Sequence, residues 1–342
     1  WVGAHKIDAG TMQVGAMTAF ITYSMMIVMS FLMLTMMSIM LPRAAVAADR
    51  IDEVIQTESS IHDAKEPEKV TTHNGVVKFS HVNFKYPGAE EDVLHDIDFT
   101  AEPGQTTAII GSTGCGKSTL LKSINRMNDL VEGCRIDGEI LLDGVNTQKM
   151  NRGELRRSVG MVLQDTWIKN GTVLENLNIG KPDATDEEIW DALTTAQARE
   201  IVEGKDGQLN FKLEQNGRNL SGGQRQRLTI ARAVVKKPEF LILDDSASAL
   251  DFATDAALRK SLHQLSGNIT TFLVSQRAAS IRQADLILVL NDGELVGKGI
   301  HDDLIRTCDI YREIYFSQFP EERAKYTVSN TAVSGGTMEV VS

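Results

Sequence analysis

Apolar residues are concentrated near the start of the chain. Between Asp8 and Arg43 the sequence contains no charged residue, and the apolar run AMTAFITYSMMIVMSFLMLTMMSIML covers residues 16–41. A helix needs about 20 residues to cross the hydrocarbon core of a membrane. The run therefore predicts a membrane-spanning helix over about residues 15–41, whereas the buried core helices of soluble proteins are usually shorter.

Features on either side of this run bear on its interpretation. A secretory signal peptide has a shorter apolar core and a small-residue cleavage site, so it fits the run less well. Arg43 and Arg50 follow the span, which favours a cytosolic location for the residues after it. The first residue is Trp1 rather than Met, and we therefore expect the chain to be a piece of a longer protein.

Beyond the span, polar residues become frequent and the pattern changes. The stretch from Pro42 to Ser60 is expected to continue as a helix in water, so we assign residues 1–60 to the C-terminal part of a transmembrane domain. Residues 61–75, IHDAKEPEKVTTHNG, are polar and charged and indicate a linker. Residues 321–342 are polar with little periodicity, which predicts a disordered tail.

Residues 76–320 show the alternating pattern of an α/β domain. Short runs rich in β-branched and apolar residues alternate with helical stretches, which predicts a largely parallel central sheet. The strand-like runs are VVKFSHVNF, QTTAIIG, EFLILDD, ITTFLVS and ADLILVL.

Composition narrows the choice of function class. The chain has a formal net charge of −11 and a pI near 5.2, which argues against a broad nucleic-acid-binding face. Its three cysteines, Cys115, Cys134 and Cys308, are widely spaced. This spacing indicates free thiols rather than a disulfide framework or a zinc site.

The strongest chemical signal is the segment GSTGCGKST, which fits the pattern G-x-x-x-x-G-K-[ST]. An apolar strand precedes it and a helical stretch follows it, which is the context that a phosphate-binding loop requires. Glycines let the backbone approach the phosphates, Lys117 neutralises the β- and γ-phosphates, and Ser118 ligates magnesium. The loop residues expected to bind ATP are Gly111, Ser112, Thr113, Gly114, Cys115, Gly116, Lys117, Ser118 and Thr119.

A phosphate loop of this kind needs a carboxylate to hold the metal ion, and the segment FLILDD at residues 240–245 supplies one. Its four apolar residues predict a buried strand, and Asp244 falls at the C-terminal end, beside the loop. Two acidic residues after a strand are an ordinary feature when they stand alone. Together with the phosphate loop they predict a site for ATP and Mg²⁺.

The segment NLSGGQRQRLTIARAVVKKPEFLILDDSASALD resembles the signature-to-Walker-B stretch of ABC ATPases over its full length. The residues that match the signature are Leu220, Ser221, Gly222, Gly223 and Gln224, and those that match the D-loop are Ser248, Ala249, Leu250 and Asp251. The resemblance implies an α/β P-loop ABC-type nucleotide-binding domain with a helical subdomain, preceded by a transmembrane helix. It also implies that the signature, at a helix start that attracts anions, binds the γ-phosphate of ATP held by a second subunit.

Three further positions match this family by their order and spacing. Tyr86, in FKYPG, stands where an aromatic ring stacks on adenine. Gln164, in VGMVLQDTW, matches the Q-loop glutamine that reaches the metal ion. The resemblance therefore implies Ser118, Gln164 and Asp244 as metal ligands. Glu214 lies just ahead of the signature, in the region that touches the intracellular loops.

The resemblance covers nearly the whole chain. The first residues, WVGAHKIDAGTMQVGAMTAFITY, resemble the end of the fifth membrane helix, an external turn and the sixth helix of an ABC exporter half. A membrane domain fused ahead of the ATPase is the exporter arrangement, whereas importer ATPases are usually separate chains. The resemblance implies a multi-pass protein of the cell membrane with a cytoplasmic nucleotide-binding domain. The default cargo is varied amphipathic drugs, as in multidrug efflux, and lipids or peptides stay open as the transported small molecule.

Two positions depart from the active members of the family, and both are catalytic. Asp245 stands where they carry Glu, which polarises the attacking water, so the carboxylate is drawn back by roughly 1.5 Å. A misplacement of about 1 Å can cost on the order of a hundredfold in rate. Gln276 stands where they carry a switch histidine, and an amide cannot carry the positive charge of an imidazolium or exchange its proton.

These departures predict a site that binds ATP well and hydrolyses it poorly, while the intact signature serves a different site. We therefore expect one half of a heterodimeric exporter, with a second exporter half that carries Glu and His at these positions. A homodimer with two slow sites is the alternative. The uncharged span and the negative net charge argue against a soluble ABC ATPase that acts on nucleic acid. The signature argues against a P-loop kinase or GTPase.

Overall fold

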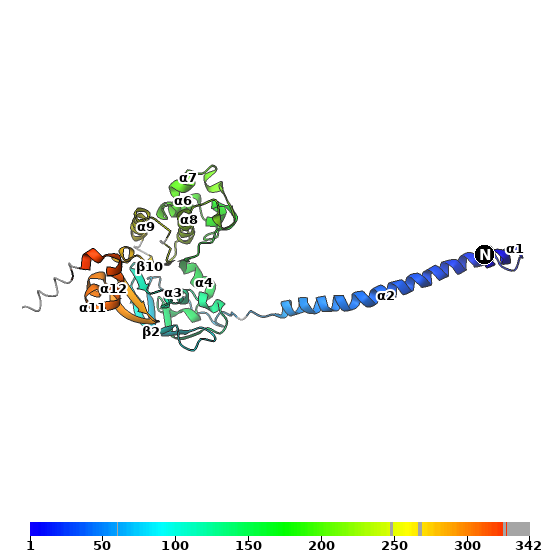
Figure 1. Cartoon of the computed structure of the whole chain (residues 1–342), viewed down its shortest axis with the longest axis horizontal. Coiled ribbons are helices and arrows are strands. Elements are labelled where there is room, and N and C mark those ends of the chain that lie inside the picture. The colour runs from blue at the N-terminus through cyan, green and yellow to red at the C-terminus, as the bar shows by residue number, and fades with distance from the viewer. Residues whose placement is uncertain (60, 247–248, 266–268, 324–325, 327–342) are drawn as a thin grey trace, which may run out of the picture. The chain divides into compact units, whose positions relative to one another are not determined.

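The computed structural model describes residues 1–59, 61–246, 249–265, 269–323 and 326. The chain divides into two compact units, Trp1–Ser60 and Ile61–Ser342 (Figure 1). The first unit is helical, and the second contains all the described strands.

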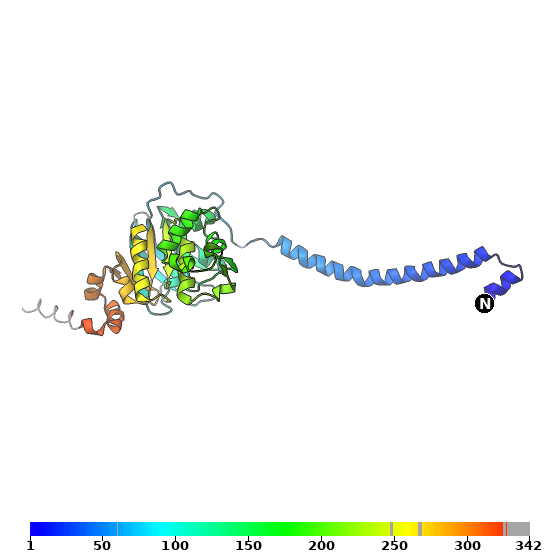
Figure 2. The ribbon, with the colours of Figure 1, turned by 90° about the horizontal axis from the view of Figure 1, so that it is seen from above.

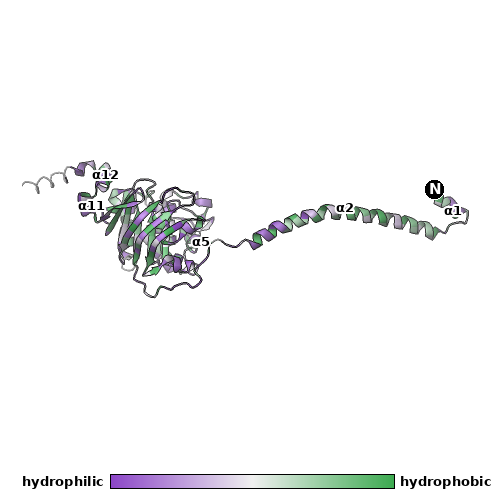
Figure 3. Ribbon diagram, turned by 90° about the horizontal axis from the view of Figure 1, so that it is seen from below, coloured by the Kyte–Doolittle hydropathy of each residue, from purple (hydrophilic) through white to green (hydrophobic). Residues whose placement is uncertain are grey.

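The first unit consists of helices α1 (Val2–Asp8) and α2 (Val14–Gln56). Helix α2 has 43 residues, which corresponds to a length of about 65 Å. Hydrophobic residues cover most of it and polar residues gather toward Gln56 (Figure 3). Its large apolar side chains are exposed, and by length and composition it is able to cross a membrane.

The predicted span and its extension form one continuous helix. Pro42 stands inside α2, although a proline removes one hydrogen bond from a helix interior. Hydroxyl side chains along the apolar stretch donate to carbonyl oxygens four residues earlier, at Thr18, Thr22, Ser24, Ser30, Thr35 and Ser38. These polar groups are therefore satisfied within the helix, which suits apolar surroundings.

The second unit is built on one mixed sheet with the strand order β5-β4-β1-β2-β12-β11-β3-β10-β9-β6. Its strands are β1 (Val77–Lys85), β2 (Leu94–Ala101), β3 (Thr106–Gly111), β4 (Arg135–Leu142), β5 (Val145–Asn146), β6 (Val159–Val162), β9 (Phe240–Asp244), β10 (Thr270–Val274), β11 (Leu286–Asn291) and β12 (Glu294–Gly299). The five from β11 to β6 are parallel. Strands β1, β2, β4 and β5 pair antiparallel.

The parallel strands form the core that positions the site. Strands β3, β9, β10 and β11 are buried along nearly their whole length, as expected for strands covered on both faces. All four lie in runs that the sequence predicts as strands, and the α/β fold is confirmed. The sheet is mixed rather than largely parallel, because β1, β2, β4 and β5 pair antiparallel and β12 pairs antiparallel with β11. The sequence does not predict β2, β4, β5 and β12, because exposed residues interrupt them or they are too short to form an apolar run.

A helical subdomain lies between β6 and β9 in the sequence. It contains α5 (Val173–Leu177), α6 (Asp186–Thr195), α7 (Arg199–Glu203), α8 (Gly222–Val234) and the small ribbon β7 (Gly171–Thr172) and β8 (Lys212–Leu213). Figure 1 shows α6, α7 and α8 grouped together. Buried apolar side chains hold them in one cluster, which includes Leu177, Ile189, Leu193, Val202 and Ile230. Capping boxes start α5, α6 and α8.

The C-terminal helices α11 (His301–Thr307) and α12 (Asp309–Gln318) pack around an aromatic cluster. Tyr311 and Tyr315 are buried there, and Tyr315 Oη donates to Glu322 Oε2 at 2.7 Å. Tyr326 packs against the same cluster. Glu322 and Tyr326 lie in the tail that the sequence predicts to be disordered, but both contact the domain. Residues 324–325 and 327–342 of that tail lie outside the described residues.

Segment 61–75 contains no helix or strand and runs over the surface of the second unit (Figure 2). Backbone N–H groups of Asn74, Gly75 and Val76 donate to the Asp143 carboxylate at 2.7–3.2 Å. Thr270 Oγ1 also donates to the Gly75 carbonyl oxygen. Backbone groups at the end of the predicted linker therefore fix it to the domain that follows it.

Candidate functional site

The predicted phosphate-binding loop connects β3 to helix α3 (Lys117–Ile124). Gly116, the N-cap of α3, has a φ of 98°, in the left-handed region that favours glycine. A Cβ at Gly116 would lie 2.7 Å from Leu94 Cδ2, and a Cβ at Gly111 would overlap the carbonyl oxygen of Leu290. The glycines are therefore required for the loop to lie this close to its neighbours, and the start of α3 provides N–H groups that attract anions.

Lys117 is folded back over this loop. Its Nζ donates to the carbonyl oxygens of Gly111 at 2.9 Å and Ser112 at 2.6 Å. The buried thiol of Cys115 lies 3.5 Å from the same nitrogen. The ammonium group is thus held at the loop, where the sequence predicts that the β- and γ-phosphates bind.

The sheet register brings Asp244 to the same edge as the loop. Asp244 pairs with Val274 of β10, and Val274 pairs with Ile109 of β3, shortly before Gly111. Asp244 is buried at the end of β9, against which α3 packs. The predicted metal carboxylate and the phosphate loop, which leads into the helix start that carries Ser118, therefore meet at the carboxyl edge of the parallel strands, where α/β sheets bind ligands.

Asp245, Gln164 and Gln276 are brought together from three separate loops. Gln276 Nε2 donates to Asp245 Oδ2 at 3.1 Å, and Gln164 Nε2 donates to the same oxygen at 3.4 Å. The Asp245 backbone N–H donates to the Val274 carbonyl oxygen at 3.1 Å, which ties this residue to β10. The two positions that depart from the family thus contact each other directly.

The charges around Asp245 link it to the phosphate loop. Burial raises the pKa of Asp245, and the neighbouring Asp244 raises it further, whereas Lys117 and Arg277 lower it. Both cations are therefore within electrostatic reach of this carboxylate. The site combines buried acidic groups at the strand end with a cationic loop, which is the charge arrangement that a metal-bound polyphosphate needs.

Tyr86 lies directly after β1 and beside the phosphate loop. Its Oη is 3.3 Å from Thr119 Oγ1, and its ring meets Phe84 edge-on with a centroid distance of 4.8 Å. The half-buried ring thus stands next to α3, on the side where the sequence predicts the adenine base.

The signature begins helix α8. Ser221 Oγ accepts a hydrogen bond from the Gln224 backbone at 3.3 Å, and Gln224 Oε1 accepts one from the Ser221 backbone at 3.1 Å. Leu220 is buried, while Ser221 is exposed. Within the described residues, the signature makes no hydrogen bond with Lys117 or Asp244. The structure therefore does not bring the signature into contact with the phosphate loop of its own chain.

The predicted D-loop precedes helix α9 (Phe252–Leu265), and its Ser248 lies outside the described residues. Asp251 accepts hydrogen bonds from the backbone and the hydroxyl of Thr254 at 2.9 and 2.8 Å, and these bonds lower its pKa. Ala249 lies against the signature, since a Cβ on Gly223 would be 3.1 Å from its carbonyl oxygen. Asp251 thus serves the start of α9, and Ala249 contacts the start of α8.

Two residues that the sequence does not point to hold the switch segment around Gln276. Arg277 Nη1 donates to the Leu250 carbonyl oxygen at 2.9 Å, and its guanidinium lies 4.9 Å from the centroid of the Phe252 ring. Gln318, at the end of α12, donates to the Gln276 carbonyl oxygen at 2.7 Å and accepts from the Ala278 N–H at 2.8 Å. Only tertiary packing places these side chains, so no local pattern in the sequence marks them.

Comparison with known proteins agrees with this geometry. Residues 94–248 match the family model described as ABC transporter. The chain is 44% identical over 322 residues to an uncharacterized ABC transporter ATP-binding protein of Mycobacterium tuberculosis, covering 93% of this chain and 54% of that protein. It is 36% identical over 307 residues to the beta-(1→2)glucan export ATP-binding/permease protein NdvA of Bartonella henselae, covering 89% of this chain and 50% of NdvA.

A solved structure has a similar fold. The structure of a bacterial Atm1-family ABC exporter with ATP bound matches 90% of this chain and 53% of its own chain, with a TM-score of 0.79 and 28% identity. The chain thus spans about half the length of the relatives that it matches.

The residues present fit a nucleotide with its metal ion. The loop is open at Gly114, where a Cβ would meet no atom within 4 Å. Lys117 supplies a cation, and Asp244 with Ser118 supplies oxygen ligands of the kind that Mg²⁺ prefers. The fold, the loop and the family match point to the same class of protein. The chain therefore carries a P-loop nucleotide-binding domain of the ABC transporter type, with an apolar helix ahead of it.

Proposed function

We propose that this chain is the ATP-binding end of an ABC exporter half, a multi-pass membrane protein with its nucleotide-binding domain in the cytoplasm. The observation that carries the proposal is the meeting of the phosphate loop, Lys117 and Asp244 at one sheet edge, in a chain that also carries an intact signature at the start of α8. The printed names of NdvA and of the Atm1-family structure refer to export, which supports efflux as the direction of transport.

In this proposal, different residues bind the phosphates, the adenine and the metal ion of one nucleotide. The loop amides and Lys117 hold the phosphates, Tyr86 stacks on adenine, and Ser118, Gln164 and Asp244 hold Mg²⁺. A bound Mg²⁺ supplies charge neutralisation at the phosphates. The signature residue Ser221 presents its hydroxyl and the start of α8 to the ATP of a second subunit.

The chain's own site is proposed to hydrolyse ATP slowly. The Asp245 carboxylate is one methylene short of the family glutamate, and Gln164 and Gln276 both donate to one of its oxygens. A carboxylate that is set back and engaged by two amides is poorly placed to polarise a water at the γ-phosphate. The intact signature would then complete the active site of a different partner, in a heterodimer. The alternative is a homodimer with two slow sites.

A cationic cleft supports coupling to a membrane domain. The cleft has a volume of about 360 Å³ and lies between α4 (Arg152–Ser158), β6 and α8. Its lining includes Arg156, Arg157, Arg232 and Lys236, and the apolar residues Met161 and Ile179. Within the described part of the chain, the buried Arg232 Nη1 has no hydrogen-bond partner. Acidic and apolar side chains of a cytosolic membrane-domain loop would fit this cleft, and β6 leads directly from it to Gln164.

Nucleotide binding and turnover of the purified chain in detergent test the proposal. We expect the chain to bind Mg-ATP, and Lys117→Ala to weaken binding by about tenfold to a hundredfold, because a charged hydrogen-bond donor is lost. Phosphate release by the chain alone is expected to be slow, and to rise when a second exporter half with Glu and His is added.

Two results would contradict different parts of the proposal. Robust phosphate release by the chain alone would exclude the impaired site and with it the reason for a heterodimer. Unchanged ATP affinity in Lys117→Ala, with the fold intact by circular dichroism, would exclude the nucleotide site itself.

A further inference from the structure

The first part of the docked segment, residues 61–70, is called the strap below. It lies between helix α2 and the sheet in the sequence, and two of its acidic residues anchor it to the domain. Its last residue, Val70, packs against the apolar cluster under the sheet. The strap is therefore part of the connection between α2 and the nucleotide-binding domain, and it is fixed to the domain at three points.

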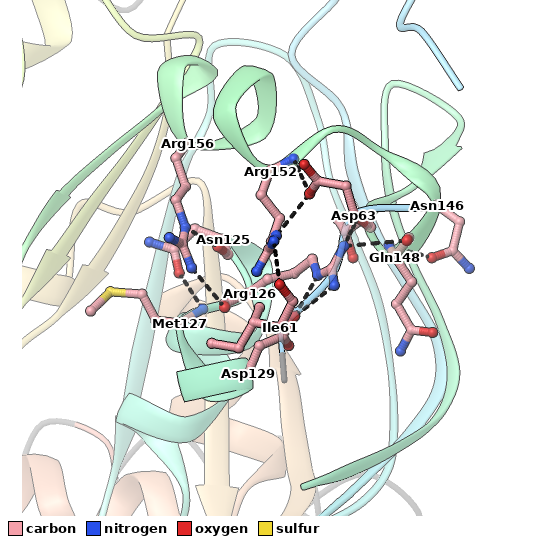
Figure 4. Close-up of polar contacts among 11 residues, drawn as sticks. Ile61, Asp63, Asn125, Arg126, Met127, Asp129, Asn146, Gln148, Arg152 and Arg156 are labelled. Atoms are coloured by element: carbon pink, nitrogen blue, oxygen red, sulfur yellow. Dashed lines mark hydrogen bonds and ion pairs between the residues drawn. The ribbon is translucent and has the colours of Figure 1, made fainter. Parts of the chain in front are cut away.

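The first anchor is Asp63, which binds the start of α4 (Figure 4). Its Oδ1 accepts hydrogen bonds from Arg152 Nε at 2.7 Å and from the Arg152 backbone at 3.2 Å. Its Oδ2 accepts from Asn151 Nδ2 at 3.1 Å. Arg152 Nη2 also donates to the Ile61 carbonyl oxygen at 3.0 Å, so one arginine holds both ends of this turn of the strap.

The second anchor is Glu68, which binds the short helix η2 (Thr147–Lys149). The Glu68 backbone N–H donates to the Lys149 carbonyl oxygen at 2.9 Å, and the Glu68 carboxylate lies 3.2 Å from Lys149 Nζ. The strap thus contacts α4 and η2 through separate charged residues.

Both of these elements in turn hold the far end of the phosphate-loop helix (Figure 4). From α4, Arg156 donates to the carbonyl oxygens of Asn125 at 3.4 Å and Arg126 at 3.2 Å, directly after α3. From the same turn, the buried Arg126 donates to the carbonyl oxygens of Thr147 and Gln148 in η2 at 3.4 and 3.2 Å. The two arms of the network therefore converge on the residues that end α3.

Helix α3 connects this point to the phosphates. It has eight residues, or about 12 Å, with Lys117 as its first residue and Asn125 as its C-cap. Leu120, Leu121 and Ile124 are buried along it, so it is closely packed along its length. A displacement at Asn125 would thus be passed to the loop around Lys117.

We propose that the strap is a positioning element for the phosphate-binding loop, in which Asp63 acts through Arg152, Arg156 and α3 to favour the ATP-binding arrangement. Asp63 touches neither nucleotide nor metal in this scheme and is a positioning residue. The inference rests on the proposed ATP binding and adds a route by which the chain leaving α2 acts on the nucleotide site. Such coupling is reciprocal: if the docked strap increases ATP affinity by some factor, ATP increases docking by the same factor.

Fluorescence titration of the full 342-residue chain in detergent with N-methylanthraniloyl ATP and Mg²⁺ tests the proposal. Asp63→Asn removes the charge and keeps the side-chain size, and we expect it to weaken binding by about fivefold, the lower end of typical coupling. Glu66→Gln is the matched control, because Glu66 lies on the same strap and has no polar contact within the described residues. It is expected to bind as the unmodified chain does.

Two further measurements separate positioning from a general structural role. In an Arg156→Gln background, Asp63→Asn is expected to cause no further loss of affinity, because the route to α3 is already broken. In the unmodified chain, Mg-ATP is expected to slow hydrogen exchange at the Glu68 amide by the same factor by which Asp63→Asn weakens binding. If Asp63→Asn does not fold, Arg152→Lys tests the same contact.

Unchanged nucleotide affinity in a folded Asp63→Asn, or exchange at Glu68 that Mg-ATP does not affect, would overturn the proposal. An equal loss in the presence and absence of Arg156 would also overturn it. Failure of the unmodified chain to bind the nucleotide would instead refute the proposed function, so the two results are distinguishable.

Discussion

The proposed nucleotide site at the strand end and the signature at the start of α8 differ in how fully they match the ABC ATPase motifs. At the strand end, the phosphate loop and Asp244 are as the family requires, but Asp245 and Gln276 depart from it and bond to each other. At the start of α8, all five signature residues match, and Ser221 forms a complete capping box. This difference is the basis of the proposed heterodimer.

The difference also shows how the two halves are stabilised. Of the two altered residues, Asp245 is buried at the end of a parallel strand and Gln276 is exposed, and their contact depends on the sheet register and on loops that are distant in sequence. The signature is held by a local hydrogen-bond exchange across four residues. The strand-end site is therefore sensitive to substitutions anywhere in its surroundings, whereas the signature is sensitive mainly to substitutions within the motif.

The largest expected effect comes from restoring the family's Glu and His at positions 245 and 276, so that the strand-end site matches the family motifs as fully as the signature does. In the double variant Asp245→Glu with Gln276→His, the longer carboxylate reaches the attacking water and an imidazole replaces the amide. We expect phosphate release by the chain alone to rise by about tenfold to a hundredfold, since two copies with intact signatures can complete each other's sites. Steady-state release of phosphate at saturating Mg-ATP measures this.

The matched control for that comparison is Asp245→Asn, which keeps the shorter side chain and removes the carboxylate. It is expected to abolish the residual turnover while ATP binding persists. Equal rates in the double variant and the unmodified chain would show that Asp245 and Gln276 do not limit hydrolysis.

A smaller effect is expected when the signature half is damaged instead. Ser221→Ala removes the N-cap hydroxyl of α8 and should cost about 1 kcal/mol of stability. Thr185→Ala removes the equivalent hydroxyl from the capping box of α6 in the same subdomain and should cost a similar amount. Urea unfolding measures both costs, and ATP affinity of the chain's own site should stay unchanged in both variants.

The two cap variants should differ only in a mixture with the partner half. Ser221→Ala is expected to lower the partner's hydrolysis, and Thr185→Ala is expected to leave it unchanged. Equal hydrolysis by both would place the signature outside the partner's active site.

The smallest expected effect is on the pH dependence of stability, through a carboxylate in the helical subdomain. Hydrogen bonds from Lys181 and Lys237 lower the pKa of Glu188 from 4.5 to about 2. Because the folded pKa is depressed, the stabilising contribution of this carboxylate is present above pH 4.5 and is lost as the pH falls toward 2. Glu188→Gln is therefore expected to flatten the decline of the unfolding midpoint between pH 5 and pH 3.

Thermal unfolding at a series of pH values checks this prediction. Asp63→Asn would serve poorly as a control, since Asp63 also has a lowered pKa. Glu66→Gln is better suited, and an identical acid profile in Glu188→Gln and the unmodified chain would contradict the assignment.

The residues that the sequence predicts well are those set by local pattern. The phosphate loop, the Walker B strand and the signature are continuous segments, and β3, β9 and α8 form where these motifs require them. The α/β class follows from the buried apolar runs. The antiparallel strands β2 and β4 were not predicted, because their burial alternates or is broken by polar residues.

Contacts between distant segments account for what the sequence does not predict. Gln318 reaches the switch segment only because α12 packs beside α10 (Ala278–Ile281). Segment 61–75 has the composition of a linker, and its docking depends on Asp143, Arg152 and Lys149, which lie far along the chain. The roles of Tyr86, Gln164 and the signature in nucleotide binding stay predictions.

Arg277 links the D-loop to the segment around Gln276, so a movement of one would be passed to the other. It follows Gln276 directly, and it grips the Leu250 carbonyl oxygen and covers the ring of Phe252, which is 70% exposed. A neighbouring domain that pressed on that ring would displace the arginine and, with it, the amide that reaches Asp245. In the proposed site, pressure on this exposed ring would therefore change the hydrogen bond between Gln276 and Asp245.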